Sequence, residues 1–414
     1  MRISVKLKLA AAFGVIILLL VVSAVLAING IGDLNAVADR LANLGSQRVK
    51  LAEEADITLG KIIRAEKNII LETTDDGIAK YDALLVAERV NEKAVVDKLR
   101  DISSEEGRRK LDSYVASLEH LYTAEDKIRA YGKMNSTPKA TAKSEEGQVA
   151  RDAANAALKP LIDRVEQAGG KLPADKVYIG LIAQKIIWSN AVVLRAERDS
   201  IAESTDAGTE KGLAEAAAAY ETSRKLRDVL AGLVGSDDRH AVEVFSDNFD
   251  KWAKIRDVVA VFDRQNSAAH AFDISTTEAR AAINQADEQA KDIVTNAETF
   301  MKGETDNATT TYQTIRTQLM VMVGVSILIA LSAATFIAVS LSRGLGKAVE
   351  LANAVAIGDL GQKIDVSSND EVKDLVNALN GMTANLNASA KVAEEIAKGN
   401  LTVQAKRLSD KDTL

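Results

Sequence analysis

Apolar residues recur at steps of three and four along most of the chain, which is the pattern of amphipathic helices. The series Val242, Phe245, Phe249, Trp252 and Ile255 is one example, and similar series precede and follow it. Sequences with the alternation of a β-strand are rare by comparison. The pattern therefore predicts an all-α protein built from bundled helices.

Capping residues and glycines interrupt the helical pattern at intervals. The expected breaks are Thr73–Gly77, Ser103–Ser104, Asn135–Pro138, Gly169–Pro173, Thr205–Gly208 and Gly235–Ser236. We expect about eight helical stretches in the segment 29–318, which is too many for one four-helix bundle.

Two long runs carry no charged residue: residues 9–28 contain twenty and residues 319–341 contain twenty-three. Each is long enough to cross a hydrocarbon core of about 30 Å. Basic residues flank the outer ends of the two runs: Arg2, Lys6 and Lys8, and then Arg343 and Lys347. The positive-inside rule places residues 1–8 and everything after 341 in the cytoplasm, and residues 29–318 outside a bacterial inner membrane.

The first run has an alternative interpretation. Val25 and Ala27 could serve as the small-residue cleavage site of a signal peptide. The run is longer, however, than the usual apolar core of about 7 to 15 residues. We therefore expect an uncleaved transmembrane helix.

A twelve-residue segment occurs twice in the outer region. Arg64–Asp75 reads RAEKNIILETTD, Arg195–Asp206 reads RAERDSIAESTD, and seven of the twelve positions are identical. A duplication explains this better than chance. In each copy the glutamate lies at helical spacing from apolar neighbours, so Glu66 and Glu197 are expected on an apolar seam and are called the seam glutamates below.

A carboxylate on an apolar seam is costly unless it is paired. Each copy also carries two cations three residues apart, hence on one helix face: Arg64 with Lys67, and Arg195 with Arg198. We expect each pair, positioned by its seam glutamate, to bind a small anionic ligand, most simply a carboxylate, through charge-assisted hydrogen bonds. The alternative is that both segments are solvated faces without a ligand.

Other chemistry is sparse in the sequence. There is no cysteine, the formal net charge is −7, and the three histidines are scattered. These features argue against metal sites and against nucleic acid as a partner. The sequence also has no glycine-rich phosphate loop and no nucleophile elbow, so neither a cofactor nor an enzyme activity is expected. Trp188 and Trp252 are expected as core anchors.

The region after the second apolar run has a distinctive order. A short amphipathic helix runs into Gly358, a connector follows with Leu360 as its first apolar point, and a second helix opens at Asp370 and Glu371. This order resembles a HAMP domain over residues 342–388, a parallel four-helix coiled coil formed by two subunits. Gly344 stands where that family usually has proline. The expected signal-relay residues are Gly344, Gly358, Leu360, Asp370 and Glu371.

The same pattern starts again further on. Ala397–Leu401 reads AKGNL and echoes Ala356–Leu360, AIGDL, with Asp412 where a second acidic start belongs. This predicts a second HAMP unit over residues 389–414, cut short at Leu414. A chance match in an unrelated helix is the alternative.

The outer region is similar to the helical bimodular sensor domain of methyl-accepting chemotaxis proteins, because both carry a repeated R-A-E-K/R-N/D segment between two spans. That resemblance implies a homodimer with two stacked bundles and small organic acids as ligands. It assigns Arg64 and Lys67 to one module's site, and Arg195 and Arg198 to the other's. It also implies a chemotaxis kinase and a coupling protein as partners.

Two other functions fit the same architecture. The chain could be the input half of a sensor histidine kinase or of a cyclic-dinucleotide enzyme, since HAMP relays serve those outputs too. It could also be a membrane-anchored coiled-coil scaffold without a ligand. The charges on the seam favour a sensor over a scaffold, and the resemblance of the outer region favours chemotaxis over the other outputs.

Overall fold

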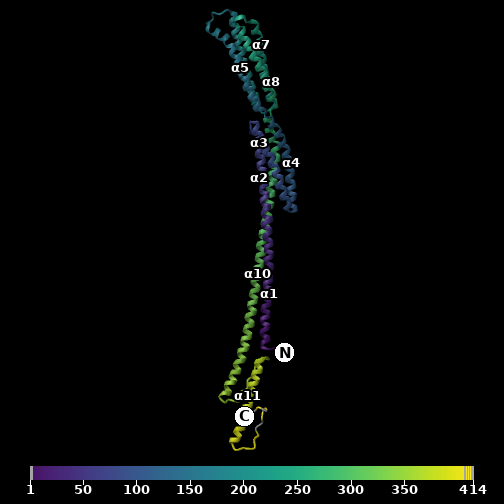
Figure 1. Ribbon diagram of the computed structural model, residues 1–414, viewed down its shortest axis with the longest axis vertical. Coiled ribbons are helices and arrows are strands. Elements are labelled where there is room, and N and C mark those ends of the chain that lie inside the picture. Colours follow the sequence, from purple (N-terminus) through teal and green to yellow (C-terminus); the bar gives the residue numbers. More distant parts are fainter. Residues whose placement is uncertain (1–2, 405–406, 408, 410, 412–414) are drawn as a thin grey trace. The chain divides into compact units, whose positions relative to one another are not determined.

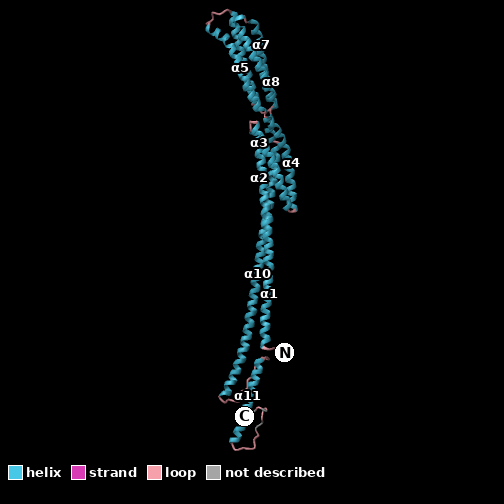
Figure 2. Ribbon diagram, viewed as in Figure 1, coloured by secondary structure: helices cyan, strands magenta, loops and turns pink. Residues whose placement is uncertain are grey.

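The computed structural model describes residues 3–404 together with 407, 409 and 411. These residues form helices joined by short loops, and no strand occurs among them (Figure 2). The elements are α1 (Val5–Arg40), a π-helical turn (Leu41–Gly45), α2 (Ser46–Leu71), α3 (Asp75–Ile102), α4 (Glu105–Met134), α5 (Ser136–Gln167), α6 (Ala174–Ile201), α7 (Asp206–Leu233), α8 (Ser236–Gln265), α9 (Ser267–Thr276), α10 (Glu278–Ala356) and α11 (Glu371–Ala397). The expected all-α fold is confirmed.

The chain divides into two compact units. One is Ala42–Lys302, and the other combines Met1–Leu41 with Gly303–Leu414. The first unit contains two helical bundles, each with its own apolar core. The second contains the two long apolar helices and the relay.

The first bundle consists of α2, α3, α4, α9 and the start of α10. Its core joins alanines of α10, such as Ala286 and Ala290, to larger side chains of α4, such as Tyr114 and Leu121. All four are at most 1% exposed. Small residues on one helix and large ones on the other let the helices pack without voids.

The second bundle consists of α5, α6, α7 and α8, of which α5, α7 and α8 are labelled in Figure 1. Its core is aromatic: the rings of Tyr220 and Phe249 stack with centroids 4.8 Å apart, and Trp252 meets Phe249 edge-on at 5.8 Å. Trp252 is a core anchor as expected. The same expectation is wrong for Trp188, which is 68% exposed because α6 turns Ile186 inwards instead.

The duplication extends well beyond the twelve-residue segment. Ser136 and Ser267 are 131 residues apart, and each backbone N–H donates to the other's hydroxyl at 3.0 Å. Arg64 and Arg195 have the same separation. Equivalent residues of the two bundles therefore differ by 131 in number, and the reciprocal serine contact joins equivalent points of the two copies.

Helix ends follow the capping residues of the sequence. Thr74 and Thr205 are equivalent N-caps, and each hydroxyl accepts from the N–H of the glycine three residues later at 3.1 Å. Asn135 and Asn266 are equivalent too, and both adopt the left-handed conformation, with φ of 49° and 41°. The sequence pattern missed the break at Asn266, since asparagine tolerates this conformation but does not require it.

In the second unit, α1 runs beside the later part of α10. Gly30 permits close contact, because a Cβ built there would stand 2.8 Å from a side-chain carbon of Ile315. The guanidinium of Arg40 also pairs with Glu304 at 3.2 Å. Large apolar side chains point outwards from both helices, for example Leu18 at 62% and Leu328 at 66% exposure.

Three helical stretches of the described residues are long and apolar enough to cross a membrane: Val5–Leu71, Ala174–Ile201 and Ser236–Ala356. Half of the apolar window in Ala174–Ile201 is buried within the second bundle, which accounts for its composition. The apolar windows of the other two have no buried share. Such exposed surfaces suit lipid and fit a membrane-anchored protein.

Candidate ligand site and signal relay

The repeated segment forms the last turns of α2 and of α6, followed by the same helix start. In the first copy the carboxylate of Glu72 accepts the N–H groups of Thr73 and Thr74 at 2.9 and 3.0 Å. It lies over Gly77, where a Cβ would stand 2.3 Å from a Glu72 carbon. Gly208 lies equally close to Glu203 in the second copy. The glycine after each repeat therefore makes room for a glutamate side chain, which in the first copy caps the start of the next helix.

Both seam glutamates are buried, Glu66 at 0% and Glu197 at 3% exposure. Glu66 lies 3.2 Å from the ammonium group of Lys67, which also donates to the hydroxyl of Ser275. Ser275 belongs to α9 and is itself buried. The first seam glutamate is thus paired with a lysine of its own helix, and a serine of another helix accepts a hydrogen bond from that lysine.

Arg64 lies on the exposed side of α2. Within the described residues, its guanidinium forms no ion pair and no hydrogen bond. The structure therefore places one free cation, Arg64, three residues before a cation that is already engaged, Lys67. Their roles in ligand binding remain predictions.

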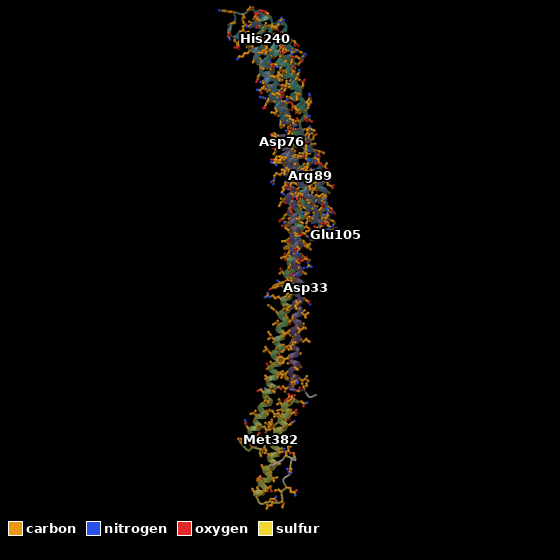
Figure 3. The ribbon with its side chains drawn as sticks, viewed as in Figure 1. Asp33, Asp76, Arg89, Glu105, His240 and Met382 are labelled. Carbon is orange, nitrogen blue, oxygen red and sulfur yellow. The ribbon has the colours of Figure 1, made fainter. Side chains whose placement is uncertain are left out.

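Further buried carboxylates accompany Glu66 in the first bundle, and the sequence pattern missed them. Glu125 of α4 is 0% exposed and receives two hydrogen bonds from Arg89 of α3, at 2.7 and 3.0 Å. Arg89, labelled in Figure 3, also lies over the ring of Tyr122 at 4.3 Å. Burial raises the pKa of Glu125 to about 7, although the charge of Arg89 acts in the opposite direction.

Glu92 of α3 is a third fully buried carboxylate of this bundle. One of its oxygens accepts the phenolic hydroxyl of Tyr114 at 2.8 Å, and the other has no hydrogen-bond partner. Burial raises the pKa of Glu92 to about 8, and the nearby charges of Asp56 and Glu54 add to the effect. The first bundle therefore holds more buried acid than buried base.

The seam glutamate of the second bundle has different partners. Glu197 accepts the hydroxyl of Ser144 and lies 3.5 Å from the guanidinium of Arg256. Burial still raises the pKa of Glu197. Arg256 in turn lies over the rings of Tyr220, at 4.6 Å, and Trp252, at 5.7 Å. A cation held against two aromatic rings thus neutralises this glutamate.

The two predicted cations of the second copy have different partners. Arg195 is 68% exposed in its side chain and pairs with Glu215 at 3.2 Å, with Asp199 further away at 3.9 Å. Arg198 donates to the side-chain oxygen of Gln148 at 2.8 Å. Because that partner is a neutral amide, the charge of Arg198 is not compensated by it.

Equivalent positions show what the duplication kept and what it changed. Ser144 and Ser275 are 131 residues apart, but Ser144 donates to the carboxylate of Glu197, whereas Ser275 accepts from the ammonium group of Lys67. Glu125 and Arg256 are also equivalent, but there the sign of the charge is reversed. A search for buried charged positions offset by 131 residues would have found this pair, whereas the short motif did not reach it.

In the relay, Gly344 is buried where α10 packs on α11. A Cβ built on Gly344 would stand 2.5 Å from a methyl carbon of Val372. A Cβ on Gly346, two residues later, would meet nothing within 4 Å. Gly344 therefore allows the close approach of the two helices.

The connector between α10 and α11 is held by side-chain to backbone hydrogen bonds. Asn380 bonds both the N–H and the carbonyl of Ile364, at 3.0 and 2.7 Å. Asn387 donates to the carbonyl of Leu360 at 2.9 Å. Gly358 begins the connector with φ of 88°, a conformation that favours glycine.

The acidic pair at the start of α11 reaches the beginning of α1. Asp370 is the N-cap of α11, accepts the N–H of Val372 at 3.1 Å and pairs with Lys8 at 2.5 Å. Glu371 accepts the backbone N–H of Val5 at 2.6 Å. The expected relay residues thus connect three helices of the second unit.

The turn after α11 repeats the turn after α10. Gly358 and Gly399 have φ of 88° and 90°, and the next residue in each case, Asp359 or Asn400, donates to the carbonyl five residues back at 2.9 or 3.0 Å. This is the glycine-ended Schellman arrangement. The repeated geometry agrees with the AIGDL and AKGNL echo, while Asp412 lies outside the described residues, so a second HAMP unit stays a prediction.

Comparison with known proteins identifies the relay. Residues 336–388 match the HAMP domain family. A protein of Acetivibrio thermocellus that is named as a sensory transducer is 34% identical over 116 residues, 28% of this chain and 21% of that protein. The match therefore covers about a fifth of the relative's length. The interpretation of this segment as a HAMP domain is confirmed, and the match begins at residue 336, within the apolar run 319–341, rather than at the expected residue 342.

Proposed function

We propose that this protein is a transmembrane chemoreceptor that senses a small carboxylate outside the inner membrane and relays the signal through its HAMP domain to a cytoplasmic kinase-control module. One observation carries the proposal: a duplicated helix end, with a buried glutamate beside surface cations, lies in the same chain as a HAMP domain. The relative named as a sensory transducer supports the signalling role.

The membrane arrangement follows from exposed apolar surface and flanking charge. Residues 9–28 of α1 and 319–341 of α10 are the proposed spans, with Lys6 and Lys8 before the first and Arg343 and Lys347 after the second. Arg2 lies outside the described residues. The positive-inside rule then puts the HAMP domain in the cytoplasm and the two bundles outside.

The ligand site needs cations that no carboxylate already neutralises. Arg64 has no partner within the described chain, and Arg198 has only the amide of Gln148. Arg195 is less suited, because Glu215 competes for it. A small organic acid would receive charge-assisted hydrogen bonds from these guanidinium groups, and a planar guanidinium binds a carboxylate through two parallel bonds.

A second copy of the chain is the proposed partner. Ile57 of α2 and Trp188 of α6 are equivalent positions, 59% and 68% exposed, and each lies two helical turns before the predicted arginine of its copy. The HAMP helices also leave apolar side chains exposed, such as Val349 at 58% and Leu375 at 43%. Dimerisation would bury both sets and bring the arginines to the subunit interface.

Binding by the full chain in lipid nanodiscs tests the proposal. Isothermal titration calorimetry against a panel of small organic acids should identify a ligand. Removing one bidentate arginine contact should then weaken binding by about 30- to 1,000-fold. The informative substitutions are Arg64→Ala, Arg195→Ala and Arg198→Ala, alone and combined.

The control is Arg109→Ala, because Arg109 is also exposed, on α4, but lies outside the repeated segment. Its affinity should match that of the natural protein. If the triple variant binds the acid as tightly as the control does, the arginines of the repeat are not the site.

A further inference from the structure

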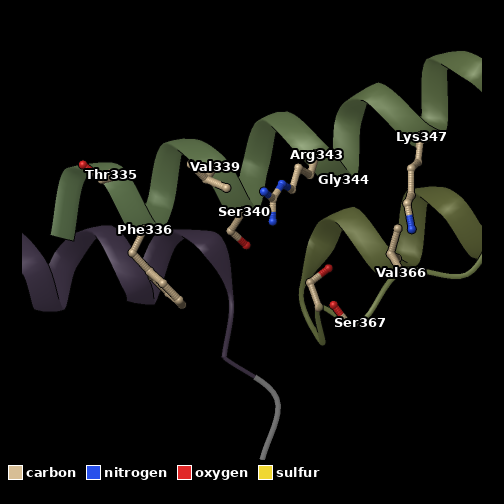
Figure 4. Close-up of a pocket in the computed structure, with 10 residues that line it drawn as sticks. Thr335, Phe336, Val339, Ser340, Arg343, Gly344, Lys347, Val366 and Ser367 are labelled. Atoms are coloured by element: carbon tan, nitrogen blue, oxygen red, sulfur yellow. The ribbon is translucent and has the colours of Figure 1, made fainter. Parts of the chain in front are cut away.

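A pocket of about 570 Å³ opens within the second unit, where the end of the second apolar run meets the connector (Figure 4). One wall is α10 from Thr335 to Lys347, and the other is Val366 with the two serines that follow it. Its lining contains two cations, Arg343 and Lys347, and no acidic residue. Its lining also contains four hydroxyl-bearing residues, Thr335, Ser340, Ser367 and Ser368.

The two cations have spare capacity for a ligand. They are four residues apart and therefore share one face of α10. Within the described residues Arg343 forms no ion pair or hydrogen bond, and Lys347 donates only to the backbone carbonyl of Asp365, at 3.1 Å. Glu350 lies one turn further along and forms no ion pair with Lys347 in the described structure. The pocket is thus a cationic recess without a counter-charge.

Its position fits the headgroup level of a membrane. The uncharged run ends at Leu341, and Phe336 and Val339, which line the pocket, are 67% and 40% exposed. The pocket therefore has an apolar end towards the span and a cationic, hydroxyl-bearing end towards the cytoplasm. Cations just beyond a span are the residues that attract anionic lipids.

The pocket is also separate from the surface assigned above to a second copy of the chain. Val349, part of that surface, follows Lys347 by two residues, and the exposed Leu345 beside it follows Arg343 by two. At 3.6 residues per turn, two residues correspond to positions about 160° apart around the helix. A partner subunit on the exposed apolar face would leave the pocket open.

We propose that this pocket binds the phosphate group of an anionic phospholipid. Arg343 and Lys347 would donate charge-assisted hydrogen bonds to the phosphate oxygens, the hydroxyls of Ser340 and Ser367 would add neutral ones, and Phe336 would contact the acyl chain. The proposal rests on the membrane topology given above. Because the two walls belong to α10 and to the connector, a bound lipid favours the HAMP packing in which these walls are close.

Native mass spectrometry of the full chain, released from nanodiscs of mixed lipid, tests the site. Phosphatidylglycerol should be retained in preference to phosphatidylcholine. The Arg343→Gln and Lys347→Gln double variant should retain about 10- to 30-fold less phosphatidylglycerol, since each cation near the surface contributes on the order of 1 kcal/mol. The matched control, Lys363→Gln, removes a charge from the same connector but outside the pocket, and should retain as much as the natural protein.

Three further arms make the result decisive. Arg343→Lys keeps the positive charge and should retain most of the phosphatidylglycerol that the natural protein retains. This variant separates an effect of charge from an effect on folding. Inorganic phosphate at millimolar concentration should not displace the lipid, and displacement would show a site for the free anion instead. Equal retention by the double variant and by Lys363→Gln overturns the proposal. Native mass spectrometry detects the retained lipid whichever leaflet of the nanodisc the pocket faces. A wrong topology would therefore leave lipid retention intact, whereas an absent lipid site would abolish it.

Discussion

Glu92 offers a direct test of how the first bundle is held together. Its carboxyl group is fully buried, accepts one hydrogen bond from Tyr114 at 2.8 Å and has a second oxygen without a partner. The substitution Glu92→Gln keeps the shape of the protonated acid and removes its titration. Glu119→Gln is the matched control, because Glu119 is exposed on α4 of the same bundle.

The expected effect follows from proton linkage. Burial raises the pKa of Glu92 from 4.5 to about 8 in the folded protein. The folded state therefore binds a proton that the unfolded state releases, so the stabilisation is fully present below about pH 4.5 and is lost as pH rises through 8. Between pH 5 and pH 8 the loss amounts to roughly 3 to 4 kcal/mol at 1.36 kcal/mol per pKa unit. Glu92→Gln should not lose it.

Hydrogen exchange with mass spectrometry measures this in the full chain, because peptides from α3 and α4 report the opening of the first bundle. Peptides from α8 give an internal reference, since they lie in the second bundle. The opening free energy of α3 should fall steeply with rising pH in the natural protein and in Glu119→Gln, and less steeply in Glu92→Gln, where Glu125, whose pKa is raised to about 7 by burial, still titrates. Equal pH slopes in all three proteins would show that Glu92 is already ionised in the folded state, and the reasoning from burial would fail.

Two further predictions concern the relay and the topology. Gly344→Ala should change the basal output of a chimera with a reporter after the HAMP domain, because the new methyl group meets Val372. The control Gly346→Ala makes the same change of helix propensity where the methyl group meets nothing, and should leave the output unchanged. Equal effects of the two substitutions would exclude the steric explanation. In intact spheroplasts an impermeant thiol reagent should label Ser113→Cys and not Ser409→Cys, two exposed positions in a chain without native cysteine, and the reverse labelling would invert the proposed topology.

The sequence predicted features that depend on local chemistry. Helix starts at Thr74 and Thr205 follow from a capping hydroxyl, and the turn at Gly358 follows from a residue without Cβ. The HAMP order could be recognised because its parts are close in sequence. The burial of Glu66 and Glu197 was also foreseeable, since three-then-four spacing decides which face of a helix points inwards.

Features that depend on contacts between distant helices could not be read in this way. The partner of Glu125 is Arg89 on another helix, and the partner of Glu197 is Arg256, 59 positions later in the sequence. Periodicity says that a residue is buried but not what it meets. Trp188 is a case in which burial itself was predicted wrongly. Its size suggested the core, but α6 has more apolar surface than one bundle covers, and Trp188 is exposed.

The two bundles share a backbone plan but differ in buried charge, and this difference bears on how each would hold an anion. In the first bundle Lys67 is engaged by Glu66, so Arg64 remains as the one free cation of the described pair. In the second bundle Arg256 of α8 neutralises Glu197, and Arg198 keeps its charge at the surface. An added carboxylate therefore meets a less acidic interior in the second bundle. At the position of Glu125 and Arg256 the sign of the charge is reversed, and Arg89 and Glu92 of the first copy correspond to Tyr220 and Ser223 of the second, so the two copies have different electrostatics on equivalent helices.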